Sequence, residues 1–198
     1  MAQLSLYYQT QLETKVSLLA KQVNADMDRH LLDNLRDKIE KKVIDNGIVM
    51  RINRLIDYDY GVIDKSNFMG TTVYNVKYEC FICSPTKNLE IVCVVDNIIR
   101  GYLIGRNGPV IIAISTNNID TQKFSINGDT IINIKTKNAI QKGDYLKVSI
   151  INVNINLGEL HIVVLCKLLN MATKDEIANF KEDQTIPDAN VEETREFI

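Results

Sequence analysis

The chain is poor in the residue types from which most catalytic and metal sites are built. Its 198 residues include no tryptophan and only two histidines, His30 and His161. Nucleophilic catalysis with a histidine base is therefore disfavoured, and so is a histidine-rich metal site. The sequence also lacks the Gly-x-Ser-x-Gly, Walker-type and His-Glu-x-x-His motifs of common enzyme classes. We expect no catalytic residue, no metal and no cofactor.

Cysteine is scarce as well, and the four cysteines lie in apolar, strand-like surroundings: Cys80, Cys83, Cys93 and Cys166. Free cysteines of this kind usually pack as small hydrophobic side chains. Cys80 and Cys83 form a C-x-x-C, but positions i and i+3 of a strand face opposite sides. The aspartates within residues 57–64 lack the spacing and the final glutamate of a calcium loop. Neither group predicts a metal site.

No apolar run approaches the roughly 20 residues that a membrane-spanning helix requires. The first residues do not combine a basic segment with an apolar one, as a secretory signal would. We therefore expect an intracellular protein without membrane contact. The formal charge of −2 is unevenly distributed, because residues 174–198 carry eight acidic and three basic side chains. Residues 86–173 hold a small basic excess, which is compatible with contact to nucleic acid.

A helix is predicted over residues 28–45. Its apolar positions recur every four residues and would form one stripe: Leu31, Leu35, Ile39 and Val43. Acidic side chains lie near its start and lysines near its end, as the helix dipole favours. Asn46 and Gly47 then offer the left-handed residue that commonly ends a helix.

Strands surround this helix. Residues 3–12 are expected to form a short strand before it, and residues 47–64 a strand that enters a turn. Apolar and polar side chains alternate along residues 73–83, as in a half-exposed antiparallel strand. Residues 1–85 therefore predict an antiparallel sheet with one amphipathic helix, and the polar stretch 84–88 marks the end of this domain.

Beyond this stretch the pattern is all-β. Residues 89–95 are apolar on both faces, which suits a strand inside a closed barrel. Glycines separate the expected strands, which lie near 89–99, 101–105, 109–115, 130–136, 145–155 and 159–168. The predicted fold class is thus α+β and mostly β, with an OB-type barrel over residues 86–170. Residues 171–198 are expected to form an acidic tail, as a short helix or a mobile segment.

Four stretches, taken in order, resemble the stalk subunit of multisubunit DNA-directed RNA polymerases, the family of the seventh subunit of RNA polymerase II and its archaeal equivalent. They are LLDNLRDKIEKKVIDNG (31–47), YGVID (60–64), VYNVKYECFICSPTKNLEIVCVV (73–95) and IQKGDYLKVSIINV (140–153). The resemblance covers residues 4–169. The chain differs from the family in having Asn75 in place of a usual proline, and few glycines after Gly61. Its bias toward Asn and Ile indicates an AT-rich genome, such as that of a protist or a large DNA virus.

The resemblance implies a non-catalytic subunit. Its first domain would form a tip that docks on the large polymerase core subunits, beside a small helical stalk partner. The residues expected at this tip are Tyr58, Tyr60, Gly61, Val62 and Ile63. An ordinary hairpin that packs its own aromatic side chains is the simpler interpretation of the same residues.

The barrel would face nascent single-stranded RNA and contact it weakly, because few aromatic side chains are available for stacking. The expected RNA contacts are Tyr102, Arg106, Lys123, Lys135, Lys137, Lys142 and Lys147, with Arg100 as a further candidate. Solvated lysines on strand edges would give the same pattern. A free-standing RNA-binding protein of translation or RNA decay is the alternative function, and a small hydrolase with a new site is a third. The stalk role implies the nucleus for a cellular protein, and the virion or host cytoplasm for a viral one.

Overall fold

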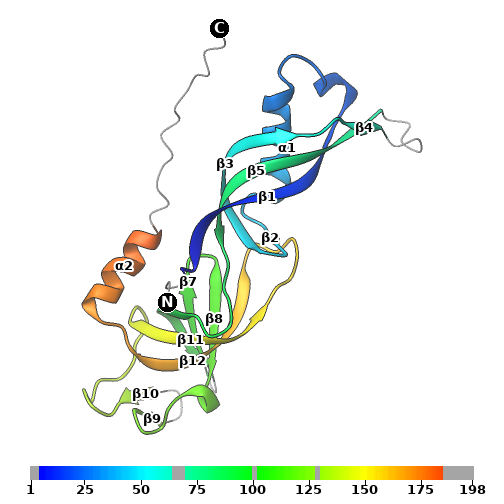
Figure 1. Ribbon diagram of the computed structural model, residues 1–198. Coiled ribbons are helices and arrows are strands. Elements are labelled where there is room, and N and C mark those ends of the chain that lie inside the picture. Colours follow the sequence, from blue (N-terminus) through cyan, green and yellow to red (C-terminus); the bar gives the residue numbers. More distant parts are fainter. Residues whose placement is uncertain (1–4, 64–69, 100–101, 128–129, 185–198) are drawn as a thin grey trace.

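The computed structural model describes residues 5–63, 70–99, 102–127 and 130–184. An N-terminal sheet with one helix joins a barrel, and a second helix lies beside the barrel (Figure 1). The N-terminal elements are β1 (Tyr7–Leu18), the 3-10 turn η1 (Ala20–Gln22), α1 (Met27–Ile39), β2 (Val43–Ile44), β3 (Gly47–Tyr58), β4 (Val62–Ile63) and β5 (Thr72–Cys83). The remaining elements are β6 (Glu90–Ile99), β7 (Tyr102–Asn107), β8 (Val110–Ser115), the 3-10 turn η2 (Thr116–Asn118), β9 (Phe124–Asn127), β10 (Thr130–Asn133), β11 (Tyr145–Asn154), β12 (Ile162–Met171) and α2 (Lys174–Gln184).

The N-terminal sheet is antiparallel, with the strand order β1-β5-β3-β2, and β4 pairs with β5. β5 occupies a central position, and its sequence explains why. Val76 and Tyr78 are buried on one face, whereas Asn75 and Lys77 are exposed on the other. The predicted alternation in this strand is therefore confirmed. β1 begins and ends later than predicted, because it pairs with the whole length of β5.

α1 packs on the apolar face of this sheet through Leu31, Leu35 and Ile39, all of them buried. It also covers part of the free edge of β1, since the Asn34 side-chain amide donates to the Ser17 carbonyl at 2.9 Å. Such cover protects the unpaired backbone groups of an edge strand.

The prediction that this helix reaches residue 45 and stops at Gly47 is wrong. The helix ends at Ile39, and the left-handed residue after it is Lys41, with φ 60°. Val43 belongs to β2 instead, where it pairs with Ile48 and donates its N–H to the Glu159 carbonyl at 2.8 Å. Val43 is buried against the barrel instead of continuing the helix. The four-residue spacing of apolar side chains in the sequence could not reveal this tertiary contact. Gly47 lies in the β2–β3 hairpin with φ 133°.

The C-terminal domain is a closed barrel with the strand order β6-β7-β8-β12-β11. All of its pairs are antiparallel except β8 with β12. Five strands in this order form the OB-type barrel that the sequence predicts. Its interior contains the inward side chains of every strand, among them Leu103, Ile112 and Val164, which are fully buried.

One predicted barrel strand lies elsewhere. Residues 130–133 form β10, which pairs with β9 in a separate two-stranded hairpin between β8 and β11. The sequence analysis did not identify β9 at all. Phe124 of β9 and Ile131 of β10 are nonetheless buried in the barrel core, so the hairpin covers one side of the barrel.

The core continues across the joint between the two parts. Leu6, Tyr7 and Cys83 from the N-terminal part belong to the same buried cluster as the barrel interior. The Tyr7 hydroxyl donates to the Asn107 side-chain oxygen at 2.9 Å, and Asn107 is itself buried. The sheet and the barrel are therefore joined by packed side chains as well as by the chain at residues 84–88.

Candidate functional site

The tip of the N-terminal sheet is the first candidate, and its side chains are unusually exposed for their type. β4 lies at the end of the sheet that is farthest from the barrel (Figure 1). Tyr60 is 97% exposed, Val62 66% and Ile63 60%. Exposed large apolar side chains grouped in this way are typical of protein interfaces. We call Tyr60, Val62 and Ile63 the tip surface. Residues 64–69 lie outside the described residues.

Tyr58 and Gly61 do not belong to the tip surface but hold the turn that carries it. The Tyr58 hydroxyl donates to the Asp28 carboxylate at 2.7 Å, and its ring meets the Tyr74 ring edge-on. This hydrogen bond raises the pKa of Tyr58. A side chain on Gly61 would overlap Thr72 and the Tyr74 ring, so only glycine allows the backbone at residue 61 to lie this close to β5. The two residues thus fix the turn from which the tip surface projects.

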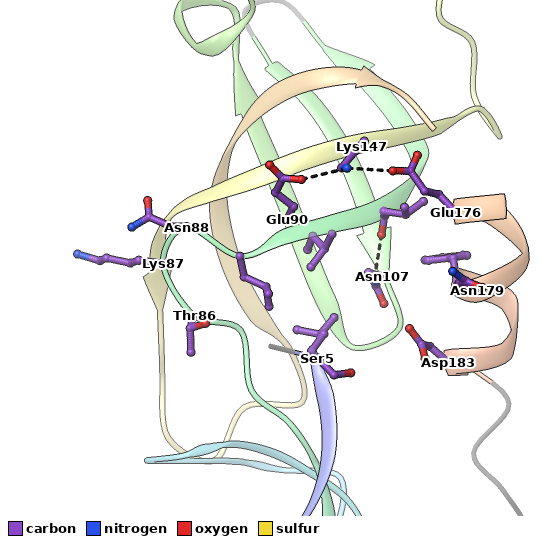
Figure 2. A pocket seen from close by; sticks show the side chains of 15 residues that line it. Ser5, Thr86, Lys87, Asn88, Glu90, Asn107, Lys147, Glu176, Asn179 and Asp183 are labelled. Carbon is purple, nitrogen blue, oxygen red and sulfur yellow. Dashed lines mark hydrogen bonds and ion pairs between the residues drawn. The ribbon is translucent and has the colours of Figure 1, made fainter. Parts of the chain in front are cut away.

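The cations expected to contact RNA are not equally available. Arg106 and Lys142 both pair with Asp96, at 3.0 and 3.7 Å. Lys147 lies between Glu90 and Glu176, at 3.0 and 2.9 Å (Figure 2). A cation already paired with a carboxylate offers less charge to a phosphate. Arg100 lies outside the described residues.

The other lysines gather near the β9–β10 hairpin. Lys135 and Lys137 are exposed, and the Ile134 amide donates to the Lys123 carbonyl at 2.9 Å, which brings the Lys123 backbone next to them. The Lys123 ammonium is half-buried and donates to the Leu169 carbonyl at 3.3 Å. The predicted strand over residues 130–136 ends earlier, at Asn133, so Lys135 and Lys137 both follow β10, and Lys137 has φ 57°. They still form the least neutralised basic group among the predicted contacts, since neither makes an ion pair within the described residues.

The outer face of β7, β8 and β12 is apolar, which the sequence analysis missed. Strand pairing places these outward side chains side by side: Ile104, Ile111, Ala113, Val163 and Leu165. In OB-type barrels this side commonly binds oligonucleotides. Here Tyr102, 52% exposed, and Arg106 lie at its margin. The signal was the run 162–166, which is apolar at both odd and even positions.

α2 is held on the barrel by its first turn. The Thr173 hydroxyl accepts from the Glu176 amide at 3.3 Å, and the Glu176 carboxylate accepts from the Thr173 amide at 2.9 Å. This reciprocal pair is a capping box. Glu176 also reaches Lys147 of β11, and Phe180 packs edge-on against Tyr145. Of the two forms expected for residues 171–198, the structure has the short helix over Lys174–Gln184, and residues 185–198 lie outside the described residues.

The pH dependence of this attachment follows from Glu176. The Thr173 amide, followed by Lys147, lowers the pKa of Glu176 in the folded protein. Because the pKa of Glu176 is lower when α2 is attached than when it is free, ionised Glu176 stabilises the attached state at pH values above the ordinary pKa of a glutamate. This stabilisation is lost as the pH falls through the lowered pKa of the attached state. We expect α2 to detach on acidification before the barrel unfolds. The contact between Phe180 and Tyr145, followed by NMR, measures this.

Thr173→Ala should weaken the attachment by about 1 kcal/mol at neutral pH, as loss of a helix cap does. Glu176→Gln should remove most of the acid-induced step. Glu13→Gln, on the exposed face of β1, is the matched control and should leave the step unchanged. An acid step of unchanged size in Glu176→Gln would contradict this account.

The cysteines are structural. All four are buried, and burial raises the pKa of Cys93 and Cys166 to about 12 and that of Cys80 to about 11. Cys80 packs with α1, whereas Cys83 packs with the barrel core, so the two sulfurs of the C-x-x-C lie in different clusters. Within the described ranges, no three His, Cys, Asp or Glu residues are arranged to hold a metal ion. Neither α1 nor α2 has the length and apolar character of a membrane span, and no other helix of the described chain has it.

Comparison with known proteins gives two informative relatives. The chain is 54% identical over 199 residues to a protein named as a DNA-directed RNA polymerase subunit in Acanthamoeba polyphaga mimivirus, and the match covers 100% of both chains. It is 28% identical over 142 residues to the DNA-directed RNA polymerase subunit Rpo7 of Sulfolobus acidocaldarius, which covers 70% of this chain and 76% of that protein. No protein-family model matches.

Proposed function

Because the chain belongs to the stalk-subunit family of DNA-directed RNA polymerases, as a viral member, we propose that it is a non-catalytic subunit that docks on the polymerase core through the tip surface. As a polymerase subunit it assembles with other subunits. The proposed partners are the large core subunits, which would receive the tip, and a small helical stalk partner. The viral assignment favours the host cytoplasm or the virion as its place of action.

The exposure of the tip surface is the observation that carries this proposal. Three large apolar side chains project from a turn that Gly61 and Tyr58 hold in place. Exposing them to water is unfavourable, and burying aromatic and aliphatic anchors commonly supplies much of the binding energy of an interface. Tyr60 would act as the central anchor, with Val62 and Ile63 beside it.

Purification of a tagged copy from infected cells tests the proposal. We expect mass spectrometry to find the large polymerase subunits in stoichiometric amount. Recovery of the chain alone, bound to ribosomal or decay-associated RNA, would instead support a free-standing RNA-binding protein. The same preparation would show whether a small helical subunit accompanies the chain.

We further propose that the barrel contacts nascent RNA weakly, mainly through Lys135 and Lys137 beside the β9–β10 hairpin. Lys123 would contribute less, because its ammonium donates to the Leu169 carbonyl. Tyr102 would stack on a base at the margin of the apolar face. Arg106, Lys142 and Lys147 would contribute less, because each shares a carboxylate. Because the polymerase would hold both this subunit and the transcript, the RNA would be at high local concentration beside the barrel. The isolated subunit would therefore not need a high affinity for RNA.

The double variant Lys135→Ala and Lys137→Ala tests this assignment. Each phosphate contact to a single strand contributes about 0.7 to the slope of log K against log salt, so we expect the slope to fall by about 1.4. Binding of a single-stranded RNA, followed by fluorescence anisotropy across a salt series, measures it. Lys15→Ala with Lys77→Ala removes the same charge from the N-terminal sheet and should leave the slope unchanged. Equal effects of the two pairs would show that only net charge matters.

A further inference from the structure

A groove of about 680 Å³ runs between α2 and the barrel, beside the start of β1 (Figure 2). Its volume falls in the range of ligand pockets, roughly 300–1,000 Å³. Apolar side chains from three parts of the chain line it: Leu6 before β1, Ile91 of β6 and Phe180 of α2. Each of them is less than a tenth exposed, so they are packed and pre-formed rather than free to move.

Ten polar side chains line the groove, among them three carboxylates and two lysines, and α2 supplies Glu176, Asn179 and Asp183. Asn179 and Asp183 are four residues apart and therefore lie on one face of α2, directed toward the barrel (Figure 2). Glu90 and Glu176 share the single charge of Lys147. The other lysine of the lining, Lys87, points away from α2 (Figure 2). The groove therefore retains negative charge above an apolar floor.

Asp183 is the carboxylate that a ligand would meet. In the part of the chain that the structure describes, no Lys, Arg or His nitrogen lies within 4 Å of it. Burial, and then the charge of Glu182, raise the pKa of Asp183. The Asp183 side chain is exposed but lines the groove, and a cation bound beside it would offset both effects.

We propose that this groove holds a short segment of another polymerase subunit, in which a Lys or Arg side chain lies next to an apolar one. The apolar side chain would pack against Phe180 and Leu6, while the basic one would pair with Asp183. The inference rests on the proposed function for the class of partner. It concerns a different surface, because α2 lies on the other side of the molecule from β4 (Figure 1).

Charge argues against two other occupants. The carboxylates would repel the phosphates of RNA. They would also repel residues 185–198 of this chain, which carry four acidic side chains and one arginine. A basic segment of a partner is the occupant that the groove complements in both charge and apolar surface.

The test places the photo-crosslinking residue p-benzoylphenylalanine at Asn179 of the full, tagged chain and purifies the polymerase after irradiation. We expect the cross-linked peptide to come from another subunit and to contain a Lys or Arg next to an apolar residue. The same probe at Ala178, which is exposed on α2 outside the groove, is the control and should cross-link roughly tenfold less. Asp183→Asn should reduce the Asn179 yield several-fold, and Asp183→Lys roughly tenfold.

Charge exchange makes the result specific. Replacing the basic residue of the cross-linked segment with Asp should restore the yield of the Asp183→Lys chain. If the large subunits are recovered but the cross-link falls on residues 185–198, on RNA, on a second copy, or nowhere, the groove assignment is overturned and the tip proposal is not. If no large subunit is recovered, the proposed function and this inference fail together.

Discussion

A chain carrying Tyr60→Ser, Val62→Ser and Ile63→Ser is expected to lose the polymerase core on purification while keeping the stability of the unmodified protein. Loss of a single interface anchor often costs about 2 kcal/mol or more, so the triple change should weaken docking at least roughly 30-fold. Folding should be unaffected, because these side chains are mostly exposed and β4 contains only two residues. Quantitative mass spectrometry of the co-purified large subunits and urea unfolding of the isolated chain measure the two expectations.

The barrel offers a matched control for this experiment. Leu157 and Leu160, in the connection between β11 and β12, are 64% and 57% exposed, close to the values for Val62 and Ile63. Leu157→Ser with Leu160→Ser should therefore leave core recovery unchanged. Equal losses in the two variants would show that general surface hydrophobicity, and not the tip, holds the subunit on the polymerase.

Gly47→Ala should destabilise the protein on the order of 3 kcal/mol. Two causes add at this position. The backbone has φ 133°, which side-chain-bearing residues rarely adopt, and a Cβ would overlap the carbonyl oxygen of Cys83 on β5. Because the overlapping atom belongs to the backbone of a central strand, neither partner can move without breaking the sheet. Urea unfolding followed by circular dichroism measures the loss.

Gly143→Ala separates the two causes. Gly143 also has a positive φ, 94°, but nothing lies within 4 Å of the position that its Cβ would take. This substitution should cost only the backbone strain, about 1–2 kcal/mol. A difference of less than about 1 kcal/mol between the two variants would contradict the steric argument at Gly47.

Local pattern was sufficient for the elements whose neighbours are close in sequence. The alternation in residues 73–83 predicts β5, and the stripe of Leu31, Leu35 and Ile39 predicts α1. The same stripe misplaced the helix end, because Val43 fits the period but packs on the barrel. The Val43 amide donates a hydrogen bond to the carbonyl of Glu159, which lies more than a hundred residues later in the chain. A window of one helix cannot contain that information.

Candidate sites divide in the same way. The turn at residues 60–63 projects as its sequence suggests, because strand pairing of β4 with β5 is local. The charge available on the barrel was not predictable, since the partners of Lys147 come from β6 and α2. The groove beside α2 requires three segments to meet, from the start of β1, from β6 and from α2. Its residues carry no motif, so the sequence gives no sign of it.

The bonds across the joint determine how force passes through this subunit. The N–H and carbonyl groups of Val43 bond to Glu159 and Gly158 of the barrel, at 2.8 and 3.0 Å, and the Tyr7–Asn107 hydrogen bond is a second brace across the joint. With a shared core between these braces, the joint resists bending, and a close-packed interior transmits displacement instead of absorbing it. The subunit should therefore act as a rigid lever. A small rotation imposed on the tip surface by a bound partner would swing the barrel through the same angle, and would move most the parts of the barrel that lie farthest from the tip.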